Sequence, residues 1–198
     1  TLSQPLCRMV DPGLTEGMVE YVAAHVLRHH LDIDAILAGQ DGEWRHAPPP
    51  LARERPVAML GLGALGRASA QALARLGFPV LGWARSKKEI AGVACHSGSA
   101  GLETVLSRAQ IVVGLLPVTP DTEDLLGAWR LSLLPRGAVI INPGRGTLID
   151  DDALLAALDS GRVSHATLDV FRTEPLPKDH HFWAHPRVTV TPHIASET

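Results

Sequence analysis

The chain of 198 residues is poor in cysteine and in aromatic side chains, and it has no long apolar run. The two cysteines, Cys7 and Cys95, are too few for a disulfide framework and suit the reducing cytoplasm. No apolar stretch approaches the roughly 20 residues that cross a bilayer, and we expect no secretory leader. The formal net charge of −3 provides no general attraction to nucleic acid or to an anionic membrane.

The rest of the composition is that of a globular protein that can bury one full core, with 45% hydrophobic and 20% charged residues. Residues 1–14 look irregular. The apolar spacing then predicts a helix that begins after an N-cap at Thr15, continues to Ala38 and ends at Gly39. Residues 1–50 therefore form a predicted helix with a stiff proline-containing linker, and residues 51–198 form the main domain.

Histidines gather in two places, and both spacings raise the question of a metal site. His25 and His29 lie one helical turn apart, but no carboxylate or cysteine cluster completes a set of ligands. A helix face or a subunit contact is the stronger interpretation. The segment His180–His185 has no common metal-ligand spacing either, and we expect it to form a loop at a pocket mouth, where Trp183 contacts a small substrate. We therefore predict no metal site.

Short apolar runs alternate with helical patterns through the main domain. The predicted strands are 57–60, 79–83, 111–116, 138–141, 165–170 and 188–191. The predicted helices are 64–76, 101–108, one or two short helices within 121–134, and a helix capped by Asp150. This alternation, with a strand at 111–116 that is apolar throughout, predicts an α/β fold with a doubly wound parallel sheet of the Rossmann type.

A glycine motif joins the first strand to its helix, and its residues are the first candidates for binding a dinucleotide: Gly61, Leu62, Gly63, Ala64, Leu65 and Gly66. Such glycines allow the tight turn, the close approach of a pyrophosphate and the packing of helix on strand. The free N–H groups of the helix then face the phosphates. The alternative is a glycine-rich turn of any α/β domain, but a helix that stops at Gly77 favours the nucleotide interpretation.

The turn after the second strand predicts which dinucleotide is bound. NAD-selective folds usually carry an acidic residue here for the ribose hydroxyl, but this chain has Trp83 and Ala84 followed by Arg85, Ser86 and Lys87. These basic and hydroxyl groups suit a 2′-phosphate, and a single charge-assisted bond is worth roughly 1.5–3 kcal/mol. A solvated basic turn is the alternative. We predict NADP(H) as the cofactor.

Three side chains with acid–base or anion-binding chemistry each follow a predicted strand. Arg145 follows the strand ending at Ile141, Glu174 follows the next strand, and His193 follows the last strand. The carboxyl ends of parallel strands share one edge of a sheet, so we expect the three to meet. Histidine can donate a proton, a carboxylate can orient its ring, and arginine can hold an anionic 2-oxo acid. Taken singly, each is equally a surface ion pair or a strand-end cap.

In combination, five segments resemble the D-isomer-specific 2-hydroxyacid dehydrogenases, and the match runs from about Thr15 onward: 61–66, 116–122, 142–146, 168–175 and 191–195. The segments 77–79, 83–86 and 174–177 are similar to its glyoxylate/hydroxypyruvate reductase branch. The resemblance implies NADPH-dependent reduction of a small 2-oxo acid, such as glyoxylate or hydroxypyruvate, with Arg145 binding substrate and Glu174 and His193 as the acid–base pair. It also implies a cytoplasmic homodimer joined partly through the helix from Thr15.

The resemblance further assigns cofactor contacts beyond the glycine motif and the basic turn: Leu116, Pro117, Thr122, Pro143, Gly144 and Asp169. The family's N-terminal substrate half and C-terminal helix have no counterpart here, so we expect a cofactor domain with a linker helix that is inactive alone. Two other functions stay open. One is a dinucleotide-sensing corepressor that binds peptides, which the basic turn disfavours. The other is a β-hydroxyacid dehydrogenase, whose lysine segment is not found.

Overall fold

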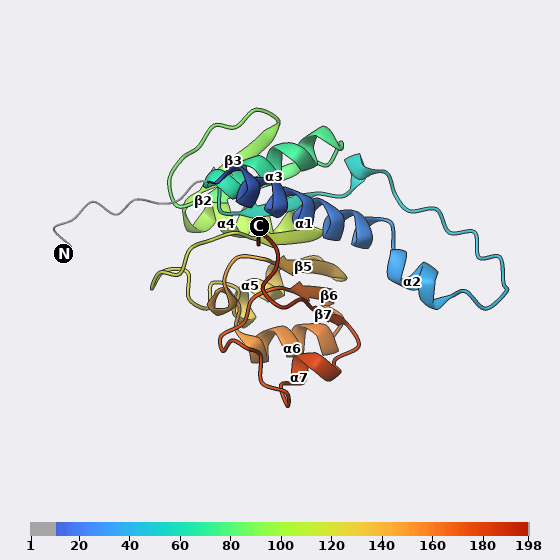
Figure 1. Cartoon of the computed structure of the whole chain (residues 1–198). Coiled ribbons are helices and arrows are strands. Elements are labelled where there is room, and N and C mark those ends of the chain that lie inside the picture. Colours follow the sequence, from blue (N-terminus) through green and yellow to red (C-terminus); the bar gives the residue numbers. More distant parts are fainter. Residues whose placement is uncertain (1–10, 198) are drawn as a thin grey trace.

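A computed structural model describes residues 11–197 of the chain. Seven parallel strands form one sheet in the order β3-β2-β1-β4-β5-β6-β7, which confirms the predicted doubly wound fold (Figure 1). The strands are β1 (Val57–Leu60), β2 (Val80–Ala84), β3 (Val93–Ser97), β4 (Ile111–Gly114), β5 (Ala138–Asn142), β6 (Val163–Leu168) and β7 (Val188–Val190). The strand order reverses between β1 and β4, where folds of this class bind their ligands.

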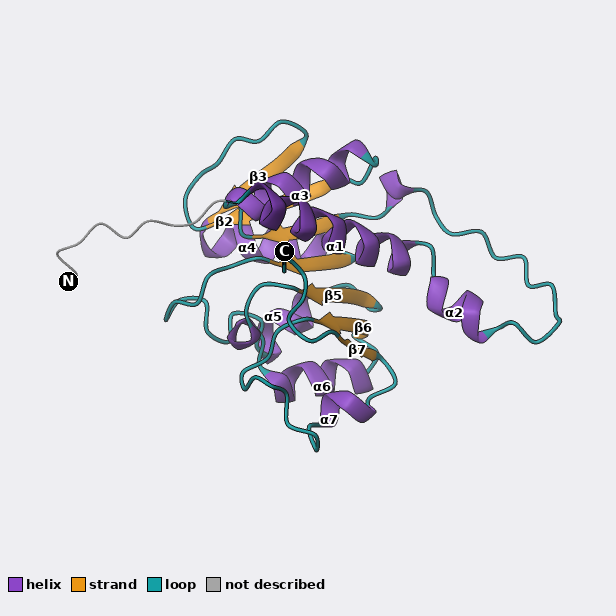
Figure 2. Ribbon diagram, in the orientation of Figure 1, coloured by secondary structure: helices purple, strands orange, loops and turns teal. Residues whose placement is uncertain are grey.

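Helices cover both faces of this sheet (Figure 2). They are α1 (Pro12–His30), α2 (Ile33–Ala38), α3 (Ala64–Arg75), α4 (Gly98–Arg108), α5 (Ala128–Leu133), α6 (Asp151–Asp159) and α7 (His181–Ala184), with the 3₁₀ turns η1 (Ala52–Glu54) and η2 (Gly146–Leu148). The predicted cap of α6 is confirmed, because the Asp150 side chain accepts the N–H of Ala153 at 2.9 Å. Gly77 likewise ends α3 with a positive φ of 92°.

The central strands are apolar on both faces because a helical layer covers each face. One core joins the buried side of α1, through Met18 and Val22, to α3 and to alternate strand residues such as Met59. The opposite core joins α4, α5 and α6 to the intervening residues, such as Leu60 and Ile140. Alternation of side chains along a strand sends neighbours to opposite faces, so both sets must be apolar. Helix α1 therefore belongs to the same core as the sheet.

The N-terminal helix differs from its prediction at both ends. It begins at Pro12 and not after Thr15, because the Asp11 side chain accepts the N–H of Gly13 at 3.0 Å and Pro12 suits the first helical position. It ends at His30, and Asp32 adopts a left-handed conformation with φ 55° before α2 starts. The predicted continuous helix to Ala38 is thus two helices. Residues 1–10, including Cys7, lie outside the described part of the chain.

Three other elements depart from the sequence predictions. An edge strand, β3, adds to the predicted set, and β6 begins at Val163 and not at residue 165. Within 121–134 the structure has one short helix, α5, in agreement with the prediction of one or two. The segment expected to be a loop around Trp183 contains the short helix α7, because the His180 side chain accepts the N–H of Phe182 and Phe182 is buried in the core. The β3 sequence mixes polar and small residues, as an edge strand allows.

The segment from α2 to about residue 51 extends away from the sheet (Figure 1). Its apolar side chains are exposed, and Trp44 is 92% accessible. Helices within residues 11–197 are either too short or too polar to cross a membrane.

Candidate functional site

The glycine motif forms the turn between β1 and α3, and two of its glycines are required by the protein's own packing. A Cβ on Gly61 would lie 2.3 Å from the carbonyl oxygen of Leu115, and Gly61 has a φ of 105°. A Cβ on Gly66 would lie 1.9 Å from the carbonyl oxygen of Gly61. Glycine at these two positions therefore allows the turn, the helix α3 and the segment after β4 to pack closely.

Gly63 is different, because a Cβ there would meet nothing within 4 Å. The fold itself gives no reason for glycine at this position, whereas close approach of a phosphate does. Gly63 is also the N-cap of α3, and no side chain in the described chain caps this helix end. The first N–H groups of α3 are therefore available to an anion. This surface fits the pyrophosphate of a dinucleotide.

The basic turn lies next to the glycine turn, because β2 pairs with β1 and the N–H of Gly61 bonds to the carbonyl of Trp83 at 2.8 Å. Arg85, Ser86 and Lys87 are all exposed immediately after β2. The Trp83 side chain is 8% accessible, and its indole N–H donates to the Gly98 carbonyl at 2.9 Å. Trp83 is thus buried at the base of the turn, while the three side chains of Arg85, Ser86 and Lys87 are exposed and free to bind a ligand.

On the other side of the glycine turn lies the loop that follows β4. Leu116 is buried at its start and Pro117 is exposed. The Thr122 hydroxyl donates to the Pro117 carbonyl at 2.6 Å and accepts the N–H of Thr119 at 2.8 Å, so it closes the loop into a compact turn. These predicted cofactor residues therefore form a wall beside the switch point between β1 and β4.

Asn142, at the end of β5, organises the loop that presents Arg145. Its side-chain amide donates to the Arg145 carbonyl at 2.9 Å, and its side-chain oxygen accepts the Gly144 N–H at 3.3 Å. Pro143 and Gly144 are buried, and a Cβ on Gly144 would press to 2.6 Å on the Gly114 carbonyl. The Arg145 side chain is exposed at this edge. Asn142 was not among the sequence candidates, although it opens the motif that they came from.

His193 and Glu174 form a direct pair, as the sequence predicts, with Nδ1 of His193 2.6 Å from Oε2 of Glu174. The other carboxylate oxygen accepts the N–H of Phe171 at 2.8 Å. Burial raises the pKa of Glu174, but the bonds from His193 and Phe171 and the positive charges of His193 and Arg145 outweigh it and hold that pKa below its ordinary value. A carboxylate only accepts, so Nδ1 of His193 carries a proton and Nε2 is the atom left for a substrate.

Asp169 is completely buried and anchors the loop that carries His193. Its carboxylate accepts three hydrogen bonds, from the Thr191 hydroxyl at 2.5 Å, the Ile194 N–H at 3.0 Å and the Ala195 N–H at 2.9 Å. Its own N–H donates to the Asn142 carbonyl at 3.1 Å, which joins the two loops. In the structure, this predicted cofactor residue holds the segment around His193.

Arg172 ties down the loop that carries Glu174. Its guanidinium donates to a carboxylate oxygen of Asp124 and, at 2.7 Å, to the carbonyl of Ile149. Asp151 lies 3.8 Å away and adds a second carboxylate. The sequence analysis did not single out Arg172, because its partners are 21 or more positions away in the chain and only the fold brings them close.

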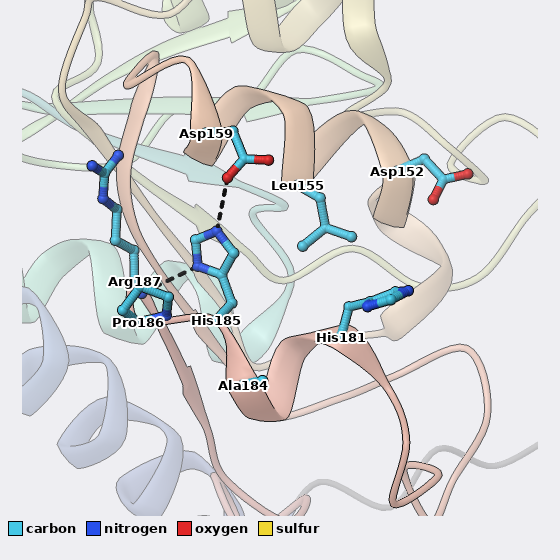
Figure 3. Close-up of a pocket in the computed structure, with 8 residues that line it drawn as sticks. All are labelled: Asp152, Leu155, Asp159, His181, Ala184, His185, Pro186 and Arg187. Atoms are coloured by element: carbon cyan, nitrogen blue, oxygen red, sulfur yellow. Dashed lines mark hydrogen bonds and ion pairs between the residues drawn. The ribbon is translucent and has the colours of Figure 1, made fainter.

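Trp183 and two of the histidines near it in the chain have different surroundings. The indole N–H of Trp183 donates to the Pro177 carbonyl at 2.9 Å, so this exposed ring is held against the loop that carries Glu174. The neighbouring histidines His181 and His185 instead line an open groove of about 570 Å³ between α6 and α7 (Figure 3).

In that groove, two residues that precede β7 make polar contacts with the C-terminal end of α6. His185 lies 3.4 Å from Asp159, and Arg187 donates to the Leu158 carbonyl at 2.7 Å. Arg187 precedes β7 and His193 follows it, so this end of the groove faces the opposite edge of the sheet from the catalytic candidates. The groove is therefore a packing feature of α6 and α7.

The two histidines of α1 have partners inside the fold. His29 Nε2 lies 2.9 Å from the Thr167 hydroxyl, and the rings of His29 and His165 are 4.8 Å apart. His25 packs on Tyr21 with ring centroids 4.4 Å apart. Within residues 11–197, no group of three or more potential ligands has the arrangement of a metal site.

Comparison with known proteins shows which family this chain belongs to. Residues 21–195 match the family model described as D-isomer specific 2-hydroxyacid dehydrogenase, NAD binding domain. A glyoxylate/hydroxypyruvate reductase A from Serratia proteamaculans is 43% identical over 195 residues, which is 98% of this chain and 62% of that protein. The homologue from Yersinia enterocolitica has the same identity and coverage. The chain thus spans 62% of the length of these curated relatives.

Solved structures are similar to the same degree. A D-isomer specific 2-hydroxyacid dehydrogenase from Xanthobacter autotrophicus Py2, in complex with NADPH and MES, superposes with a TM-score of 0.95 at 46% identity, covering 100% of this chain and 82% of that one. An NADPH-dependent glyoxylate/hydroxypyruvate reductase from Sinorhizobium meliloti, in complex with NADP and sulfate, gives 0.94 at 41% identity, covering 99% and 64%.

Proposed function

The chain belongs to the D-isomer specific 2-hydroxyacid dehydrogenase family, and from that premise we propose that it is the cofactor-binding and acid–base part of an NADPH-dependent reductase. The substrate is a small 2-oxo acid such as glyoxylate or hydroxypyruvate, and the product is the 2-hydroxy acid. The observation that carries the proposal is the His193–Glu174 pair, with 2.6 Å between Nδ1 and Oε2, at the strand edge that also presents Arg145.

The cofactor is held in this proposal by the elements around the switch point. The open space at Gly63 and the uncapped start of α3 support the placement of the pyrophosphate. The exposed Arg85, Ser86 and Lys87 support a contact with the 2′-phosphate, since they follow the strand next to the glycine turn. Two similar solved structures are complexes with NADPH and with NADP, which supports NADPH as the cofactor. Bound NADPH supplies the hydride that reduces the carbonyl carbon.

The side chains of this protein then handle the anion and the proton. Arg145 binds the carboxylate of the 2-oxo acid through its planar fork of donors. Glu174 stays ionised, keeps the proton of His193 on Nδ1 and stabilises the positively charged ring. The protonated Nε2 donates its proton to the carbonyl oxygen as that oxygen gains negative charge, so one hydride and one proton give the hydroxyl group.

A second copy of the chain is the proposed partner, bound through the extended segment from α2 to residue 51. This segment exposes Ile36, Leu37 and Trp44, at 56%, 61% and 92%. Apolar groups gathered on a projecting segment favour burial against another protein surface. A homodimer of a cytoplasmic enzyme agrees with this exposure and with the free thiol of Cys95.

Oxidation of NADPH and NADH by the full-length protein, with glyoxylate or hydroxypyruvate as substrate, tests the function. We expect turnover with NADPH and much less with NADH. Replacement of Arg85 by alanine should narrow that preference about ten- to hundredfold, as the loss of one charge-assisted bond predicts. The matched control is Arg108→Ala, since Arg108 is an exposed arginine just before β4, at the opposite sheet edge.

The His193→Gln variant separates binding from catalysis. It should bind NADPH as the wild type does and lose most of its turnover at saturating substrate. His181→Gln, on α7 and outside the site, should keep both. Tight binding of NADPH by a wild-type protein that turns over neither substrate would refute the reductase proposal and favour a dinucleotide-sensing module.

A further inference from the structure

The loop that presents His193 is held by contacts on both sides of that residue. His193 itself has a positive φ of 57°, a conformation that a non-glycine residue adopts only when its surroundings require it. Two residues before it, the Thr191 hydroxyl donates to Asp169, and just after it the N–H groups of Ile194 and Ala195 donate to the same carboxylate. Buried Asp169 is therefore the clamp that sets the position of the His193 ring.

Helix α1 completes this clamp from a distant part of the chain. The Tyr21 hydroxyl lies 2.8 Å from the Thr191 hydroxyl oxygen, although the two residues are 170 positions apart. A threonine hydroxyl has one proton, and the carboxylate of Asp169 can only accept, so the proton of Thr191 is committed to Asp169. Tyr21 must therefore be the donor to Thr191, and the bonds run in one direction from α1 to the buried carboxylate.

The protonation of the Tyr21 phenol agrees with its role as the hydrogen-bond donor to Thr191. Burial raises the pKa of Tyr21 to about 12, and the nearby Asp169 charge adds to this rise against the opposing bond with Thr191. The phenol thus keeps its proton throughout the neutral range. Its ring packs on His25, one turn further along α1, with centroids 4.4 Å apart, and its hydroxyl reaches Thr191 directly after β7.

We propose that Tyr21 is a positioning residue for the acid–base site, because its hydroxyl orients Thr191 onto Asp169 and so holds His193 in reach of Glu174. This inference rests on the proposed function, which it deepens by adding α1 to the machinery of turnover. Tyr21 touches none of the reacting groups and acts only through Thr191. Without its donor, the Thr191 hydroxyl is free to rotate away from Asp169 and the loop loses one side of its clamp.

Replacement of Tyr21 by phenylalanine in the full-length protein is the test, since it keeps the ring and removes the hydroxyl. We expect kcat to fall about tenfold, equivalent to about 1.4 kcal/mol, with KM and NADPH affinity within about twofold of the wild type. Thr191→Val should lower kcat at least as much, and Thr191→Ser, which keeps the hydroxyl, should restore it. Glu20→Gln, an exposed neighbour on α1, is the control and should change nothing.

Two further measurements decide whether Tyr21 acts through His193. In a His193→Gln background, Tyr21→Phe should cause no additional loss of turnover, and an undiminished tenfold loss there would overturn the inference. The ¹⁵N spectrum of the His193 ring, assigned by its absence in His193→Gln and recorded at alkaline pH where the ring is neutral, should show a single Nδ1–H tautomer in the wild type and a mixture in Tyr21→Phe. An unchanged spectrum with unchanged kcat would also overturn it. If the wild type turns over no 2-oxo acid, the proposed function alone fails, and the ring spectrum still decides the role of Tyr21.

Discussion

His29 should make the stability of the protein depend on pH through the contact between α1 and the sheet. Burial lowers the pKa of His29 to about 3, and the positive potentials of His165 and Arg28 add to this effect against the opposing charge of Asp34. The ordinary value is 6.5. The folded state therefore prefers the neutral ring, which lies 2.9 Å from the Thr167 hydroxyl.

The sign and size of the effect follow from this difference. Above the unfolded pKa of 6.5 the full stabilisation is present, and it is lost as the pH falls from 6.5 toward 3, since the unfolded chain then binds the proton more readily. At about pH 5 the loss spans about 1.5 pH units, and at 1.36 kcal/mol for each unit this amounts to about 2 kcal/mol. That is a large share of the stability of an ordinary domain.

Urea unfolding at about pH 7.5 and about pH 5 measures the loss. His29→Gln keeps a polar side chain opposite Thr167 and cannot be protonated, so its free energy of unfolding should fall about 2 kcal/mol less than that of the wild type. His46→Gln, on the exposed linker, should lose as much as the wild type. An equal loss in His29→Gln and the wild type would refute the reasoning, because the stability change would then come from other groups.

Two other predictions concern the cofactor turn and the loop of Glu174. Gly61→Ala should destabilise the fold by several kcal/mol, because its Cβ would lie 2.3 Å from a backbone oxygen, whereas Gly63→Ala should leave stability unchanged and weaken NADPH binding about tenfold. Urea unfolding and fluorescence titration separate the two, and unaltered affinity in Gly63→Ala would contradict the phosphate site. Arg172→Ala should lower kcat about tenfold at unchanged NADPH affinity, since Arg172 holds the Glu174 loop through Asp124 and the Ile149 carbonyl. Lys178→Ala, an exposed cation of the same loop, is its control, and steady-state kinetics showing equal kcat in both variants would exclude this role.

Local signals in the sequence were sufficient for most of the sheet and for the pairing of His193 with Glu174. The glycine turn, the cap at Asp150 and the apolar strands follow from short-range geometry, and each reappears in the structure. The rule that parallel strands end at a common edge was enough to predict that His193 meets Glu174. Local signals failed where two conformations compete within a few residues. The turn at Asp32 divides a helix that the apolar spacing continues, and the small helix α7 depends on burying Phe182.

The sequence by itself therefore determined the class of fold, the nucleotide turn and the chemistry available at the strand ends, because these depend on backbone preferences and on neighbouring residues. The tertiary structure alone decided which groups hold that chemistry in place. Tyr21 meets Thr191 across 170 positions, and Arg172 meets Asp124 across 48. Such contacts leave no periodic trace in the chain, since a hydrogen bond between distant residues depends on how whole elements pack and not on the spacing of residue types.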